Sequence, residues 1–282
     1  MINDLKTDAT EDVPWELFHE NSKVSLSGRH PSFKLHPTDA TIVSMMRQLH
    51  TVHPYVDCPK VALPDILPPS TRPFDNVLRE RVTARSFRPA AIGLDQLAKV
   101  LSMSYGITQS SEGTPFPRDF RVIPSGGALF PLEIYFYAAR VDGLEPGLYH
   151  YNPEANNLDQ LRKGDELASV ARLFIQPDLA EASAAIFFIA AYFGRSVFKY
   201  GDRGYRFILL EAGHLAQNAN LTAQEMGLAT ANIGGYVDRD TDRYLRLDGV
   251  NQSTIYALMI GQPDRGRTST HDDHVTFTMA SD

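Results

Sequence analysis

The sequence predicts one long helix in the stretch Gly204-Tyr-Arg-Phe-Ile-Leu-Leu-Glu-Ala-Gly-His-Leu-Ala-Gln-Asn-Ala-Asn-Leu-Thr-Ala-Gln-Glu-Met226. We expect the helix to begin after Gly204, with Asp202 as its cap, and to stop at Gly227, because glycine commonly ends a helix. Small side chains recur along it at spacings of four, three and four residues, at Ala212, Ala216, Ala219 and Ala223. Such a stripe lets another helix approach closely.

The other edge of this helix carries polar side chains among leucines. The residues there are Leu210, His214, Gln217, Asn218 and Leu221. Amides on a helix with so few charges are expected to be buried, where the backbone or a ligand must satisfy their hydrogen bonds. A histidine in this position either contacts a ligand or is satisfied by a neighbouring carbonyl or carboxylate, and the second reading is favoured.

Strands and shorter helices surround the long helix in the sequence. Aromatic and β-branched runs predict strands over 132–138, 185–192 and 254–260, and 147–151 with 158–161 resembles a smaller hairpin. A second helix is expected from Leu94 onward. These elements indicate a mixed α/β domain over residues 76–268. Residues 1–75 are expected to form an extension that ends in a proline-rich connector, and 269–282 a tail.

Composition excludes several classes of protein. The 282 residues are 43% hydrophobic and 22% charged, as in an ordinary folded soluble protein. The net charge of −7 argues against a general electrostatic grip on nucleic acid or on an anionic membrane. Cys58 is alone, which forbids an intrachain disulfide and a cysteine-rich metal centre. The longest apolar run, 184–193, is half of the roughly 20 residues that span a bilayer, and a cytoplasmic location is the default because no secretory signal is recognisable.

Several weak signals for ligand binding follow one another along the chain. The glycine-rich dinucleotide and P-loop signatures, the hydrolase elbow and the zinc-protease motif are all missing. Arg81-Val82-Thr83-Ala84-Arg85 instead offers two guanidiniums and a hydroxyl, which suit a phosphate unless the segment is simply a solvated turn. Pro124-Ser-Gly-Gly-Ala-Leu-Phe-Pro131 and Ala231-Asn-Ile-Gly-Gly-Tyr236 are glycine loops where backbone amides can approach a flat ligand, or plain turns. Arg265 and Arg267 add two further cations near the end of the chain.

In this order and spacing, the motifs resemble those of the nitroreductase-like flavoproteins. Within them the chain is similar to the SagB-type dehydrogenases, which include the azoline oxidases of thiazole- and oxazole-forming peptide biosynthesis. The resemblance runs from about Arg72 to Pro263, and 17–23 also resembles the leading segment of that group. It implies an α+β nitroreductase-like fold with a central, mostly antiparallel sheet sandwiched by helices. It also implies bound FMN and a homodimer in which each FMN lies at the subunit interface.

The resemblance assigns cofactor-binding roles residue by residue. It implies that the phosphate is held by Arg81, Val82, Thr83 and Arg85 with Arg265 and Arg267, and the isoalloxazine and ribityl groups by Pro124, Ser125, Gly126, Gly127 and Leu129. The segment near flavin N5 would be Ile233, Gly234 and Gly235, beside the helix that carries Gln217 and Asn218. Ordinary nitroreductases have asparagine and glutamine where this chain has Ala128 and Phe130. That departure fits the SagB-type branch.

The segment Phe198-Lys-Tyr-Gly-Asp-Arg-Gly-Tyr-Arg-Phe207 is the strongest marker of this subgroup. The resemblance nominates Lys199 and Tyr200 as a catalytic pair. Converting an azoline to an azole removes a proton from one ring carbon and a hydride from its neighbour, so a base must face the ring opposite the flavin. Without the resemblance, a surface ion pair of Lys199 with Glu211 or Asp202 would be the favoured reading.

We therefore expect an FMN-dependent dehydrogenase that oxidises a thiazoline or oxazoline, with O2 regenerating the flavin. The ring would belong to a ribosomal peptide or to a carrier-tethered nonribosomal intermediate, within a synthetase complex. The alternatives are an NAD(P)H-dependent nitro or quinone reductase and a noncatalytic scaffold subunit. No metal is expected, because His271-Asp-Asp-His274 lies in a terminal tail where such groups are usually solvated. Trp15 and Phe18 either cover a groove or belong to the core of the extension.

Overall fold

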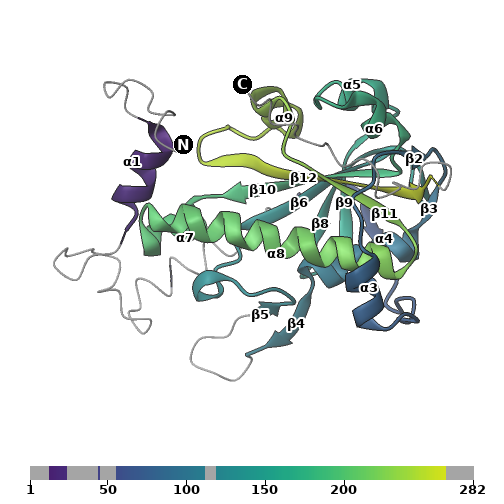
Figure 1. Ribbon diagram of the computed structural model, residues 1–282, viewed down its shortest axis with the longest axis horizontal. Helices are drawn as coiled ribbons and strands as arrows, with labels where there is room; N and C mark the ends of the chain where they lie inside the picture. The colour runs from purple at the N-terminus through teal and green to yellow at the C-terminus, as the bar shows by residue number, and fades with distance from the viewer. Residues whose placement is uncertain (1–12, 24–43, 45–54, 112–118, 265–282) are drawn as a thin grey trace, which may run out of the picture.

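A single antiparallel sheet forms the centre of the computed structural model, which describes residues 13–23, 44, 55–111 and 119–264 (Figure 1). Its strand order is β1-β9-β8-β6-β10-β12-β11, and β2 pairs with β12 at one end, which makes eight strands. The strands are β1 (Lys60–Ala62), β2 (Phe87–Arg88), β6 (Leu132–Ala138), β8 (Gly147–Asn152), β9 (Asn157–Lys163), β10 (Ala185–Tyr192), β11 (Ala229–Ile233) and β12 (Gln252–Pro263). The predicted antiparallel sheet is thus confirmed.

The two middle strands, β6 and β10, have the bounds that their composition predicts. Every residue of β6 is buried, and Phe136 lies opposite Phe187 of β10. Aromatic side chains on both faces of these strands need cover on both sides of the sheet. The third predicted strand is longer than expected at both ends, because Gln252 and Ser253 pair with β10, and Gln262 and Pro263 pair with β2. That pairing joins residues far apart in the chain, which local sequence patterns do not reveal.

Helices cover both faces of the sheet and bury one apolar cluster on each. On one face, α4 (Leu94–Tyr105) packs against α8 (Arg203–Glu225), which crosses the sheet in Figure 1. The other face is covered by α5 (Leu167–Ala171), α6 (Pro177–Ala182) and α9 (Asp238–Leu245). The four alanines of α8 are all buried in the first cluster, as their spacing predicts. This arrangement is the predicted helix–sheet–helix sandwich.

The long helix differs from the prediction in two respects. It runs from Arg203 to Glu225, and Asp202 stands at its N-cap position without a side-chain capping bond, because its backbone is already helical. The expected burial of the amide edge is wrong for Gln217, which is exposed. Asn218 is half-buried and donates from Nδ2 to the Met103 carbonyl of α4 at 3.2 Å. This edge faces away from the sheet, so the chain's own core does not cover it.

The remaining described elements are short. They are α1 (Pro14–Asn21), α3 (Phe74–Glu80), β3 (Ile92–Gly93), β4 (Ile107–Ser110), β5 (Asp119–Arg121), η3 (Gly126–Ala128), β7 (Val141–Asp142) and α7 (Gly194–Tyr200). Phe18 of α1 meets Tyr205 edge-on, with ring centroids 5.4 Å apart, whereas Trp15 is 67% exposed and therefore not a core residue. In the described part of the chain, no helix combines the length and apolar character needed to cross a membrane.

Candidate active site

Lys199 and Tyr200 end the short helix α7, which folds back on α8 through a tight turn. Gly201 has a φ of 55°, and a Cβ on Gly204 would come within 3.0 Å of the Ser196 backbone carbon, so the turn requires small residues. The Tyr200 ring packs edge-on against Phe207 with centroids 5.0 Å apart. The Lys199 Nζ lies 5.3 Å from the centre of the Tyr200 ring. The turn therefore presents an amine and a phenol side by side.

The glycine loop before β6 packs against this pair. A Cβ on Gly127 would lie 2.5 Å from the Tyr200 hydroxyl and 2.9 Å from the Lys199 Nζ. Gly127 also has a φ of 68°, which favours glycine. The structure thus brings together two motifs that are more than 70 residues apart in the sequence. Within the described residues, Lys199 forms no ion pair with Glu211 or Asp202, so the surface-pair reading is wrong.

Hydrogen bonds hold the glycine loop in an unusual conformation. Ser125 accepts on its Oγ from the Phe130 amide at 2.9 Å, and its carbonyl accepts from the Ala128 amide at 3.0 Å. Ala128 and Phe130 have φ values of 52° and 41°, a region that L residues rarely adopt. Backbone strain of this kind persists where surrounding contacts determine it and is concentrated at functional sites.

The second group of predicted residues lines a pocket of about 440 Å³. Thr83 and Arg85 form one side, Asn232 and Ile233 of β11 another, and residues 175–179 a third. The Arg81–Arg85 segment is held beside β11, because the Ala84 amide donates to the Thr230 carbonyl at 2.8 Å. The buried Asn232 Oδ1 has no hydrogen-bond partner among the described residues. An unmet acceptor that is buried costs free energy.

The other predicted cofactor residues are placed less tightly. Arg81 donates from Nη1 to Thr83 Oγ1 at 3.4 Å, and a Cβ on Gly235 would come within 2.9 Å of the Ile175 Cδ1. Arg265 and Arg267 lie outside the described residues, as does His271–His274. The last described residue, Asp264, accepts a hydrogen bond from the Ser86 hydroxyl at 3.0 Å. The chain therefore reaches position 264 next to the Arg81–Arg85 segment.

One chain does not bring its two groups of predicted site residues together. The glycine loop meets Phe207 near the start of α8, whereas the Arg81–Arg85 segment follows α3, which lies at the other end of that helix (Figure 1). Arg72, just before α3, donates from Nη1 to the Gln224 carbonyl at 2.8 Å. At about 1.5 Å rise per residue, positions 207 and 224 are roughly 25 Å apart along α8.

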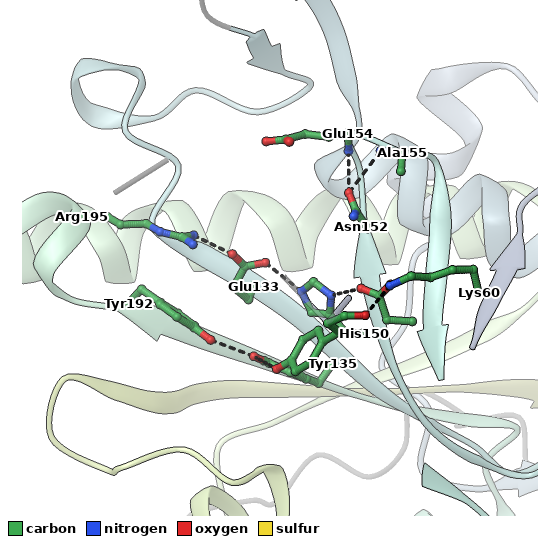
Figure 2. A network of polar contacts seen from close by, with 11 residues as sticks. Lys60, Glu133, Tyr135, His150, Asn152, Glu154, Ala155, Tyr192 and Arg195 are labelled. Carbon is green, nitrogen blue, oxygen red and sulfur yellow. Dashed lines mark hydrogen bonds and ion pairs between the residues drawn. The ribbon is translucent and has the colours of Figure 1, made fainter. Parts of the chain in front are cut away.

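A chain of polar side chains runs from Arg195 of α7 across β6, β8 and β9 to Lys60, and all of its members except Lys60 are buried (Figure 2). Arg195 Nη1 lies 2.6 Å from Glu133 Oε1, and His150 bridges Glu133 Oε2 at 2.9 Å and Asp159 Oδ2 at 3.0 Å. Lys60 completes the chain at Asp159. Burial opposes ionisation of Glu133, but Arg195 and His150 outweigh it and lower its pKa to about 2. The Glu133–Arg195 pair thereby ties α7 to the sheet.

Comparison with known proteins assigns the chain to a family. The model of the nitroreductase family matches residues 78–262. The chain belongs to the nitroreductase family. MJ1384, a candidate nitroreductase of Methanocaldococcus jannaschii, is 33% identical over 196 residues, which are 68% of this chain and 91% of that protein.

Two further matches are a trifolitoxin-processing protein and a chain of a microcin synthetase. The trifolitoxin-processing protein TfxB of Rhizobium leguminosarum is 27% identical over 217 residues, which are 72% of this chain and 56% of TfxB. The solved Escherichia coli microcin synthetase McbBCD complex, with truncated pro-MccB17 bound, contains a chain that superposes with a TM-score of 0.58. That chain is 21% identical, and the match covers 89% of this chain and 92% of it.

Sequence reasoning missed two features of this nitroreductase-family site. The buried network was not predicted, although an isolated charged residue inside an apolar strand, such as Glu133 in 132–138, is a recognisable signal. The second is the environment of Glu211, which the sequence suggested only as a partner for Lys199. Its Oε1 accepts from the Tyr105 hydroxyl at 3.2 Å, and burial raises its pKa to about 7.

Proposed function

We propose that the chain is an FMN-dependent dehydrogenase of the SagB type, which oxidises a thiazoline or oxazoline ring to the thiazole or oxazole. The observation that carries the proposal is the contact of Gly127 with the Lys199 amine and the Tyr200 hydroxyl. The family resemblance implies that this loop contacts the flavin and that Lys199 and Tyr200 remove the proton from the ring. Their juxtaposition is what a dehydrogenase needs, because the proton and the hydride must leave adjacent ring atoms.

The Lys199–Tyr200 pair has the chemistry for the proton half of the reaction. An azoline becomes an azole when it loses one proton and one hydride from neighbouring ring carbons. FMN, when bound, supplies the hydride acceptor, and O2 is the proposed terminal oxidant. The amine and the phenol can each exchange a proton next to Gly127. Packing on Phe207 and the tie from Arg195 to Glu133 hold the pair in place.

The pocket beside β11 has donors that suit the FMN phosphate. Arg85 and the Thr83 hydroxyl can donate to phosphate oxygens, and a guanidinium does so bidentately. The phosphate of FMN thus fits the donor chemistry of this pocket.

A homodimer is the arrangement that would join the two halves of the site. The outward edge of α8 exposes Leu209 and Leu210, the latter by 61%, and Met103 of α4 lies beside it. A second copy that covers this edge would bury Gln217 as well. It could also place its glycine loop over the pocket of the first copy, which a single chain does not do.

A peptide is the proposed carrier of the ring. TfxB is named for processing trifolitoxin, and the McbBCD complex is named as a microcin synthetase with truncated pro-MccB17 bound. This chain resembles TfxB and one chain of that complex. We infer that it acts on an azoline-bearing peptide or carrier-tethered intermediate within a synthetase complex in the cytoplasm.

The experiment is the oxidation of a synthetic thiazoline peptide by the FMN-loaded chain in air. Product is detected as the loss of two hydrogen atoms per ring by mass spectrometry. Lys199→Met and Tyr200→Phe should each abolish product while FMN absorbance remains. Lys163→Met, at an exposed lysine paired with Glu145, is the matched control and should retain activity. Full activity in both site variants would refute the assigned roles.

A further inference from the structure

The short helix α1 ends against the first turns of α8, beside α7 (Figure 1). The last turn of a helix leaves carbonyl groups without partners inside that helix. Arg203 donates from Nη1 to the Ser22 carbonyl at 3.2 Å, and Arg206 donates from Nη2 to the His19 carbonyl. Two guanidiniums of α8 thus cap the C-terminal end of α1, where positive charge is also favourable.

Aromatic rings link α1 to the start of α7. Phe18 of α1 meets Tyr205 edge-on, with ring centroids 5.4 Å apart. The Tyr205 ring also lies 5.6 Å from that of Phe193, which is the N-cap residue of α7. Helix α1 has eight residues, none of them buried, and a helix of that length is marginal by itself in water. Its order therefore depends on these contacts with α8.

Arg203 links α1 to the end of α7. One turn further along α8, the Arg203 guanidinium carbon lies 5.9 Å from the centre of the Phe207 ring, which is within the range of a cation–π contact. Phe207 packs edge-on against Tyr200, the last residue of α7. A Cβ on Gly126 would lie 3.2 Å from the Phe207 Cδ2. The Phe207 ring is therefore a common neighbour of Arg203, Tyr200 and the glycine loop.

We propose that Arg203 is a positioning residue for Tyr200, and that α1 is the element that holds Arg203 in place. Arg203 acts through the Phe207 ring and has no assigned part in the proton transfer. The catalytic meaning of the position of Tyr200 rests on the proposed function. The structural claim, that docking of α1 steadies α7, is independent of it. One role thereby joins the 17–23 segment to the arginines of the 198–207 segment.

Loss of the α1 contact would release the Arg203 side chain. The Ser22 carbonyl holds the guanidinium near the Phe207 ring, and a released arginine gains hydration by turning toward solvent. Because Tyr200 packs on Phe207, a shift of that ring moves the Tyr200 hydroxyl relative to Gly127. Displacement of a reacting group by about 1 Å can lower a rate on the order of 100-fold.

Amide hydrogen exchange of the 282-residue chain tests the structural claim without any substrate. Exchange is measured in peptides covering 14–21 and 194–200 and normalised to peptides from β10. Phe18→Ala removes the edge-on ring contact, so exchange should rise roughly 3- to 10-fold in 14–21 and at least about twofold in 194–200. Trp15→Ala is the matched control on the same helix, because Trp15 is 67% exposed, and it should leave 194–200 unchanged. Unchanged exchange of 194–200 in Phe18→Ala would overturn the proposal.

Arg203→Met tests the positioning role in the FMN-loaded chain. On anaerobic mixing with a thiazoline peptide, the maximum rate of flavin bleaching should fall roughly 10- to 100-fold. The half-saturating peptide concentration and the FMN dissociation constant should stay as in wild type. Arg203→Lys keeps a cation that can donate to the Ser22 carbonyl and should recover part of the rate. Arg243→Met, at an exposed arginine, is the control and should bleach as wild type.

Two results would overturn the positioning role. They are an unchanged bleaching rate in Arg203→Met, and a loss of FMN affinity that accounts for the whole loss of rate. A wild-type chain whose flavin the thiazoline does not bleach would instead overturn the proposed function and leave the exchange result standing.

Discussion

The hydroxyl of Tyr200 lies 2.5 Å from the place that a Cβ on Gly127 would occupy. No real Cβ is found that close to another heavy atom, so an alanine there forces a movement. The atoms in the way are the far ends of Tyr200 and Lys199, which are flexible side chains. The movement would therefore displace the proposed catalytic pair and leave the backbone largely intact.

Gly127→Ala should fold but lose azoline oxidation. The positive φ costs about 1 kcal/mol, and the clash turns Tyr200 and Lys199 away from the loop. Gly227→Ala is the matched control, because Gly227 has a φ of 74° with nothing within 4 Å of its Cβ position. Urea unfolding should show similar losses of stability in the two variants, and thiazoline turnover should be lost in Gly127→Ala alone. Equal turnover in both would contradict the assigned geometry.

Arg85→Ala should weaken FMN binding through the phosphate. A hydrogen bond to a charged group contributes roughly 1.5 to 3 kcal/mol, so the dissociation constant should rise about 10- to 100-fold. Titration of the apoprotein with FMN, followed by flavin fluorescence, measures it. Arg243→Ala, at an exposed arginine paired with Asp240, should leave the affinity unchanged. An Arg85 variant that binds FMN as tightly as wild type would show that Arg85 does not bind the FMN phosphate.

Arg195→Met should destabilise the chain by about 3 to 5 kcal/mol, because it leaves the Glu133 carboxylate buried without its cation. Arg195→Met combined with Glu133→Gln should recover much of this loss, since no buried charge is then left alone. Because the folded pKa of Glu133 is lowered to about 2, its stabilising effect is present above pH 4.5 and is lost as pH falls toward 2. Urea titrations at neutral and acid pH check both statements, and an additive double variant would argue against the pair.

Glu211→Gln should change how global stability depends on pH. The folded pKa of about 7 exceeds the ordinary 4.5, so wild type loses stability as pH rises between these values. The free energy of unfolding of the variant relative to wild type should therefore increase by roughly 2 to 3 kcal/mol from about pH 5 to about pH 8. Parallel pH profiles for the two proteins would mean that Glu211 is ionised in the fold at neutral pH.

Local patterns in the sequence predict the central elements of the fold well. The strands 132–138 and 185–192 and the buried alanines of α8 follow directly from apolar runs and helical spacing. What those patterns miss is long-range pairing. The extension of β12 by β2 and the chain from Arg195 to Lys60 depend on residues that only the folded sheet brings together.

The candidate site was predictable as a set of motifs but not as an arrangement. The glycine loop and the Lys199–Tyr200 pair are separate features of the sequence, and their contact follows from the α7–α8 turn. The exposure of Gln217 shows the opposite case, in which a side chain expected inside the core lies on an edge that the single chain leaves open. Glu211 was visible in the sequence, but its hydrogen bond from Tyr105 depends on the packing of α4 against α8.

The most direct test of the proposed dehydrogenase is anaerobic mixing of the FMN-loaded chain with a thiazoline substrate and, separately, with NADPH. We expect the thiazoline alone to bleach the flavin absorbance, and Lys199→Met and Tyr200→Phe to prevent this. Bleaching by NADPH, with the thiazoline leaving the flavin oxidised, would contradict the proposed dehydrogenase and identify a nicotinamide-dependent reductase.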